Sequence, residues 1–263
     1  MGRGMALGPL IGGACVDRWG AVTGLRIAFG GALAMAVVAA LFQQLLIEDD
    51  RPQRPGPASL PIPPEKNPLR LLKSMPGELK ELLASDILIR FCEQIPYPFV
   101  VIWCMQIISQ PVSGVEFGLL TTLEMATAVA VYIPVAHFAD RGRKKPFVVA
   151  TFVFFALFPL ALMASQSFWM LAGAFALRGL KEFGEPTRKS LILDLAPPER
   201  QAAMFGLYYL IRDVAVSLAA LGGAWLWSIA PQLNLIAASA FGLAGTLWFA
   251  WQGKDLPQKE PTK

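Results

Sequence analysis

The amino-acid sequence predicts an all-α fold, a polytopic helical membrane protein with about eight transmembrane helices. Hydrophobic residues make up 55% of the 263 residues and charged residues only 16%, against roughly 25% in soluble domains. A span needs about 20 mostly apolar residues, because the hydrocarbon core is about 30 Å thick and a helix rises about 1.5 Å per residue. The segments PFVVATFVFFALFPLALMA and LNLIAASAFGLAGTLWFAW meet that length without a charge.

The chain begins with two apolar segments, residues 1–16 and 25–47. The first is short for a membrane span and contains the pattern GMALGPLIGG. Small residues in such a pattern let two helix backbones approach closely, and the proline removes a helical hydrogen bond and kinks the helix. The residues of this helix-packing motif are Gly4, Gly8, Pro9, Gly12 and Gly13.

Residues 48–85 are expected to form a linker. The part over residues 48–68 is charged and rich in proline, so it can neither span a membrane nor pack as a regular helix. Pro76 begins the sequence PGELKELLASD, in which leucines on one side and charges on the other predict a short amphipathic surface helix.

Residues 86–252 are expected to form a six-helix bundle, followed by a tail over residues 253–263. The expected spans are residues 86–108, 113–138, 146–165, 167–194, 203–229 and 232–252.

The charges in the turns orient these spans. The turns DRGRKKP and APPERQ and the C-terminal tail alternate with the uncharged turns SQPVSG, SQS and APQLN. Because an excess of Lys and Arg marks the cytoplasmic side, the linker, the basic turns and the C-terminus are expected in the cytoplasm, with the protein in the cell (inner) membrane. The net charge of +4 is then a topology signal, and no nucleic-acid partner is expected. The spacings of Cys15, Cys92 and Cys104 predict neither a disulfide nor a metal site.

The linker, the six spans and the basic turn between the second and third of them resemble the C-terminal half of a major facilitator superfamily (MFS) transporter. The loop signature of that family, Gly-x-x-x-Asp-Arg-x-Gly-Arg-Lys, is matched in part by Asp140, Arg141, Gly142, Arg143 and Lys144. Ala136 stands in place of the first glycine, and one residue is missing between Arg141 and Gly142. The resemblance implies a loop that closes and opens during transport.

The opening pattern resembles the fifth-helix signature of the same family, Gly-x-x-x-Gly-Pro-x-x-Gly-Gly, which is found mainly among proton-coupled exporters. The resemblance implies helices five to twelve of a twelve-helix member, a partial MFS fold that is truncated at its N-terminus, with residues 1–47 as the remnant of the N-terminal half. An alternative is that Gly13, Asp17, Arg18 and Gly20 match the loop signature instead. That alternative needs an internal deletion, and Ala21 and Val22 then replace the expected basic pair.

Charged residues inside the spans are candidates for a proton or substrate pathway, because such residues are costly in lipid and usually face the protein interior or a water-filled path. The candidates are Arg90, Glu93, Glu124, Arg178, Glu182, Arg212 and Asp213. Glu124 has no charged partner three or four residues away in its own helix, which makes it the preferred proton site, since a dry environment favours a protonated carboxyl group. The alternative is that acids and bases only neutralise each other and hold the helices together. Arg188 and Lys189 are expected to be cytoplasmic topology charges.

No enzyme activity and no cofactor are expected, because the sequence has no phosphate-binding glycine loop, no His-Glu-x-x-His and no Gly-x-Ser-x-Gly. The sequence and the resemblance predict transport of a small organic solute, such as drug-like efflux, by alternating access in exchange for protons. The expected partners are the small-molecule substrate, protons and the lipid bilayer. The alternative function is a truncated, non-transporting membrane remnant or an interaction protein.

Overall fold

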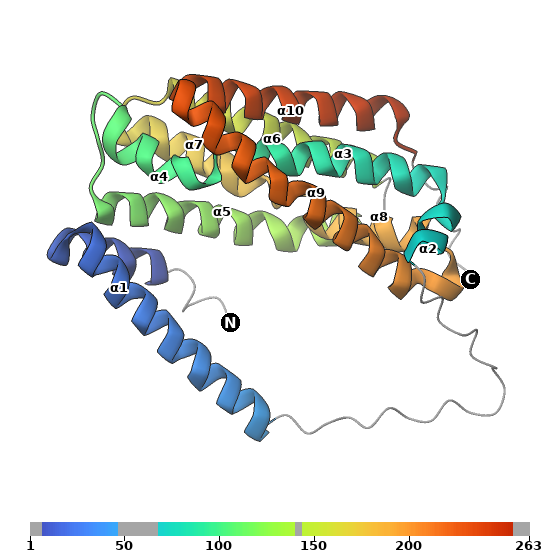
Figure 1. Cartoon of the computed structure of the whole chain (residues 1–263), viewed down its shortest axis with the longest axis horizontal. Coiled ribbons are helices and arrows are strands. Elements are labelled where there is room, and N and C mark those ends of the chain that lie inside the picture. The colour runs from blue at the N-terminus through green and yellow to red at the C-terminus, as the bar shows by residue number, and fades with distance from the viewer. Residues whose placement is uncertain (1–6, 47–67, 140–143, 255–263) are drawn as a thin grey trace.

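The computed structural model describes residues 7–46, 68–139 and 144–254, and these ranges form helices and turns without a strand (Figure 1). The long helices are α1 (Leu7–Leu46), α3 (Gly77–Gln94), α5 (Gly114–Ala139), α6 (Lys145–Ala164), α9 (Gln201–Ile229) and α10 (Pro231–Gln252). The shorter ones are α2 (Pro68–Ser74), α4 (Val100–Ile102), α7 (Phe168–Leu180) and α8 (Glu185–Leu195). The all-α class predicted from the sequence is confirmed.

Six helical segments of the described chain are long and apolar enough to cross a membrane. They are Gly8–Leu45, Gly77–Ile107, Gly114–Tyr132, Lys145–Ala164, Pro198–Ile229 and Pro231–Gln252. The sequence predicted about eight spans, and two features explain the difference. The first two apolar segments form the two helical parts of α1, which are joined at Gly20, where a non-helical φ of 77° is accessible to glycine, and they count here as one segment. The expected span over residues 167–194 is divided by a turn into α7, of 13 residues, and α8, of 11 residues.

The amphipathic segment after Pro76 differs from its expected form. It is the first part of α3 rather than a separate surface helix, and Leu79 and Leu82 are 0% exposed. Their side chains join an apolar cluster with residues of five other helices, including Phe152 of α6 and Phe249 of α10. The leucine stripe therefore faces protein, because α6, α8, α9 and α10 supply the apolar partners that a surface helix would lack.

Polar side chains hold α10 to the helices around it. Asn234 donates its side-chain N–H groups to the backbone oxygens of Ile95 (3.1 Å) and Gly223 (2.8 Å). Ser239 donates to the backbone oxygen of Ala156 in α6 (2.7 Å). Such interhelical hydrogen bonds stabilise membrane bundles, where the apolar surroundings give no hydrophobic preference for protein over lipid.

The helix-packing motif lies in the first part of α1, which packs on α5 (Figure 1). A Cβ atom on Gly13 would lie 2.1 Å from the backbone oxygen of Gly114, and one on Gly118 would lie 2.6 Å from that of Pro9. The Asp17 carboxylate accepts hydrogen bonds of 2.8 Å from the first two N–H groups of α5. Gly8 and Gly12 face open space, and Gly4 lies outside the described residues. Beyond the kink α1 leaves the bundle, as Figure 1 shows.

Candidate functional site

Three charged residues of α3 lie on one face of the helix, as their spacing of four and three residues predicts, and each contacts a charged residue elsewhere in the bundle. Asp86 pairs with Arg188 of α8. Arg90 pairs with Glu185 of α8 at 3.3 Å, and Glu93 pairs with Lys181, which follows α7, at 2.8 Å. The shared face thus joins α3 to the α7–α8 region.

The turn between α7 and α8 determines which charges meet. α7 ends at Leu180, and α8 begins at Glu185 with a proline in its first turn, where no hydrogen-bonding N–H is needed. Gly184 donates its backbone N–H to the Thr151 hydroxyl of α6 at 2.5 Å, which ties the turn to the bundle. In an unbroken helix Lys181 and Glu185 would be neighbours. The break separates them: Lys181 pairs with Glu93 and Glu124, whereas Glu185 pairs with Arg90, Arg188 and Lys189.

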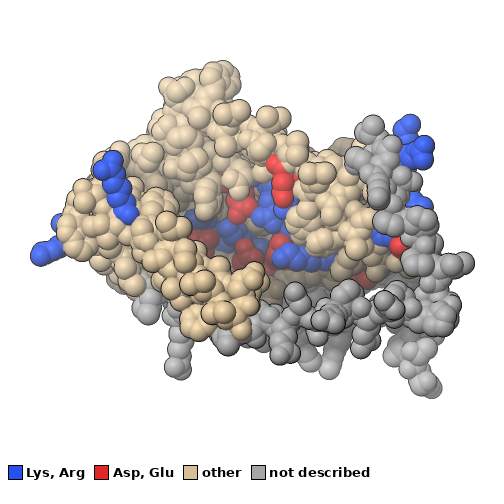
Figure 2. Space-filling model, turned by 60° about the horizontal axis from the view of Figure 1, so that its bottom comes forward, with Lys and Arg blue, Asp and Glu red and all other residues tan. Residues whose placement is uncertain are grey.

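Ten charged side chains form one continuous series of ion pairs in which acids and bases alternate, and we refer to this series as the charge ladder. In order it contains Arg178, Glu124, Lys181, Glu93, Arg90, Glu185, Arg188, Asp86, Arg212 and Asp213. Among these ten side chains five bases face five acids, and Lys189, which also pairs with Glu185, adds a sixth base as a branch of the series. In Figure 2, acidic and basic side chains gather in a hollow on one face of the molecule. Alternation is expected for charges at membrane depth, because each one needs a partner of opposite sign.

The pair of Asp86 and Arg188 is the most deeply buried part of the ladder. Both side chains are 1% exposed and in direct contact, and Tyr208 donates its hydroxyl to the Asp86 carboxylate at 3.0 Å. Arg212 approaches the same carboxylate at 3.6 Å. Arg188 was expected as a topology charge, but its side chain is buried one turn inside α8 and pairs with Asp86 of α3; its cytoplasmic side stays a prediction. Its neighbour Lys189 is 48% exposed.

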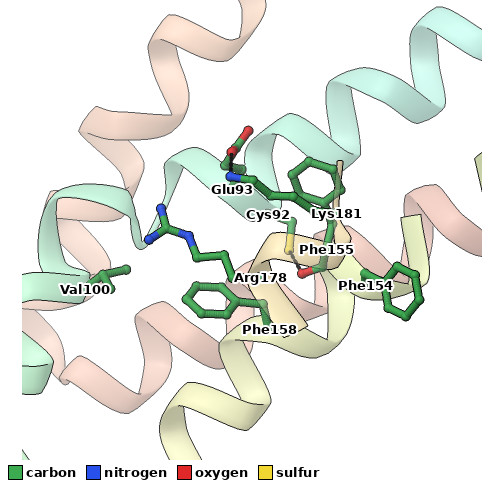
Figure 3. A pocket seen from close by; sticks show the side chains of 8 residues that line it. All are labelled: Cys92, Glu93, Val100, Phe154, Phe155, Phe158, Arg178 and Lys181. Atoms are coloured by element: carbon green, nitrogen blue, oxygen red, sulfur yellow. Dashed lines mark hydrogen bonds and ion pairs between the residues drawn. The ribbon is translucent and has the colours of Figure 1, made fainter. Parts of the chain in front are cut away.

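A small pocket lies at the Arg178 end of the ladder (Figure 3). It is lined by Cys92, Glu93, Val100, Phe154, Phe155, Phe158, Arg178 and Lys181. The Arg178 guanidinium lies 5.1 Å from the centre of the Phe158 ring, with Tyr97 and Phe175 at 5.7 and 5.8 Å. These distances are those of cation–π contacts. In Figure 3 Arg178 reaches over Phe158, while Lys181 reaches Glu93.

The charged partners of Glu124 lie outside its own helix, on α7 and in the turn that follows it. Its carboxylate lies 3.1 Å from Arg178 and 3.6 Å from Lys181. Arg178 therefore pairs with Glu124 of another helix, and Glu182, four residues further along the chain, lies in the turn after α7. At the other end of the ladder, Asp213 is 62% exposed and pairs with the adjacent Arg212 at 2.7 Å.

The loop motif is described only at its last residue. Asp140, Arg141, Gly142 and Arg143 lie outside the described residues. Lys144 donates to the Ser190 hydroxyl at 2.6 Å and pairs with Asp194, both on α8. This end of the basic turn is therefore fixed to α8, the helix that also supplies Arg188 to the ladder.

Membrane-length helices with buried, paired charges among them support an integral, multi-pass membrane protein. Residues 82–263 match the family model of the Major Facilitator Superfamily, which covers the bundle from α3 onward. The chain belongs to this superfamily, whose members are membrane transporters, and the resemblance noted in the sequence is confirmed. No curated protein gives a significant match to the chain.

Proposed function

We propose that this chain takes part in moving a small organic solute across the membrane by alternating access, coupled to protons at the charge ladder. Membership of a transporter family supports the general role. The observation that carries the proposal is the charge ladder itself, which runs through the bundle from the pocket to the exposed Asp213. Intramembrane charges are costly and usually mark substrate or proton pathways.

Glu124 is the proposed proton acceptor of the ladder. Its distances to bases, 3.1 and 3.6 Å, are longer than those of Glu93, which are 2.7 and 2.8 Å. The weaker pairing means that Glu124 loses less interaction energy than Glu93 when a proton neutralises it. Protonation would break the pair with Arg178 and so weaken the contact between α5 and α7. A proton is thereby linked to helix movement, which alternating access requires.

The turn at Lys144 is the proposed gate. Its ties to Ser190 and Asp194 hold the start of α6 against α8, and a solute path at this end must break and reform them. We expect this gate on the cytoplasmic side, because the turn is basic.

Flux in proteoliposomes tests the proposal. The full chain is reconstituted with pyranine inside the vesicles, and the internal pH is followed after a gradient of ethidium or of benzenesulfonate is applied. We expect proton movement that depends on the solute and that is reduced in Glu124→Gln. If neither solute moves protons beyond protein-free vesicles, the non-transporting alternative, a membrane remnant or interaction protein, is the better account.

A further inference from the structure

We infer that the pocket at Arg178 is a binding site for a single water molecule, which connects the two ends of a four-residue part of the charge ladder. The four residues are Arg178, Glu124, Lys181 and Glu93. The site rests on the size, the polarity and the charge balance of the pocket. Its role in proton coupling rests in addition on the proposed function.

The size of the pocket fits one water molecule. About 10 Å³ is available inside it to the centre of a water molecule, and a buried water needs about 10–15 Å³ by this measure. The lining side chains lie close together: Cys92 and Val100 are 1% and 3% exposed, and Phe155 and Phe158 are also buried. An organic solute does not fit in this space, whereas one water molecule does.

The charged lining residues provide the hydrogen-bond partners that a buried water needs. Buried waters make about three hydrogen bonds, whereas cavities with only apolar walls stay dry. Arg178 and Lys181 carry N–H groups that donate, and the Glu93 carboxylate accepts. The Nη1 atom of Arg178 is directed to Glu124, which leaves further N–H groups of the guanidinium for another acceptor. A carboxylate has about four acceptor positions, so Glu93 can accept from water as well as from Arg90 and Lys181.

The charges around the pocket favour a neutral occupant over an ion. Arg178 pairs with Glu124 at 3.1 Å. Lys181 pairs with Glu93 at 2.8 Å and with Glu124 at 3.6 Å. An added anion or cation would leave a charge without compensation at membrane depth, which is costly. Water has no net charge, and it can donate and accept at the same time.

The water joins Arg178 to Glu93. Within the described residues these two side chains form no ion pair with each other, and Figure 3 shows the guanidinium apart from the Lys181–Glu93 pair. A water that accepts from Arg178 and donates to Glu93 closes the open series of four residues into a ring. When a proton neutralises Glu124, as proposed above, Arg178 loses its ion-pair partner. The water then leaves the guanidinium with an acceptor and with a link to the Glu93 charge, which lowers the free-energy cost of the protonated state.

The test is radiolytic hydroxyl labelling of the full chain in nanodiscs, measured by mass spectrometry with an unirradiated sample as background. An X-ray pulse splits water, and the hydroxyl radicals react close to where they form. A buried side chain is therefore oxidised when a bound water lies beside it. Cys92 and Cys104 are 1% and 0% exposed, and of these two cysteines Cys92 lines the pocket. We expect Cys92 to be oxidised severalfold faster than Cys104, which is the internal control.

Substitutions at Val100 test whether the labelling comes from this pocket. Val100→Leu adds one methylene group to a lining side chain, which takes up the space for one water and should reduce Cys92 oxidation to the level of Cys104. Val100→Ala keeps the space and should keep the labelling. Val112→Leu is the matched control, because Val112 is buried outside the pocket lining, and it should leave Cys92 oxidation unchanged.

Two results would overturn the assignment. One is oxidation of Cys92 in the unsubstituted chain that is no faster than that of Cys104, which means that the pocket is dry. The other is fast oxidation of Cys92 that persists in Val100→Leu while Cys104 stays protected, since the radicals then come from elsewhere. Because labelling does not depend on flux, fast Cys92 oxidation in a chain that moves no protons in proteoliposomes would count against the transport proposal alone. Proton-coupled flux with Cys92 protected would count against this inference alone.

Discussion

Substitution of Asp86 by asparagine removes one charge from the most buried part of the ladder. The Asp86 carboxylate contacts Arg188 directly, accepts the Tyr208 hydroxyl at 3.0 Å and lies 3.6 Å from Arg212. Asparagine keeps an oxygen that can accept from Tyr208 but has no charge to offset Arg188, which is 1% exposed. Removal of one partner of a buried ion pair costs about 3–5 kcal/mol, because the other charge stays buried without compensation.

Asp86→Asn should therefore lower the free energy of unfolding of the bundle by about 3 kcal/mol. This value lies at the lower end of the range because Glu185 still pairs with Arg188. The free energy of unfolding is measured by titration with sodium dodecyl sulfate in mixed micelles, followed by tryptophan fluorescence. Asp213→Asn is the matched control, since Asp213 is 62% exposed and exposed ion pairs contribute about 0–1 kcal/mol.

The double variant Asp86→Leu with Arg188→Met separates charge compensation from packing. Replacing both charges with apolar side chains of similar volume is often neutral or stabilising, whereas loss of one partner is not. We expect the double variant to be more stable than Asp86→Asn. The reasoning is refuted if Asp86→Asn and Asp213→Asn cost the same, or if the double variant is the least stable of the set.

Three further predictions follow from other parts of the chain. Gly118→Leu should detach the first part of α1 from α5, because a Cβ atom on residue 118 would lie 2.6 Å from the backbone oxygen of Pro9. The rate of amide hydrogen exchange should then rise in α1 and stay unchanged in α10. A cysteine at Ser113 should react with an impermeant thiol reagent added outside intact cells, and a cysteine at Ser59 should not; the reverse pattern would invert the expected orientation. The three native cysteines are buried and should add little background labelling. Lys144→Ala should slow solute flux in proteoliposomes without reducing membrane insertion, because it releases the basic turn from α8; unchanged flux would exclude the proposed gate.

Length and hydropathy were sufficient to predict the all-α membrane fold, because an apolar segment of about 20 residues has few alternatives to spanning a bilayer. Spacing along one helix was also informative, because intervals of four and three residues place Asp86, Arg90 and Glu93 on one face of α3, where the structure has them. The break between α7 and α8 was harder to predict from the sequence. The sequence KEFGEP has a glycine and a proline, yet the apolar residues on both sides continue the pattern of a single span.

Arg188 shows why the ion-pair partners could not be predicted. It stands next to Lys189 and close to a basic turn, which is the usual sequence context of a cytoplasmic topology charge. Its partner Asp86 is 102 residues away in the chain, and no periodicity links the two. The same holds for Glu124, whose lack of a partner within its own helix suggested a solitary carboxyl group. Pairs between helices depend on tertiary distances, whereas spacing reports only on neighbours within one helix.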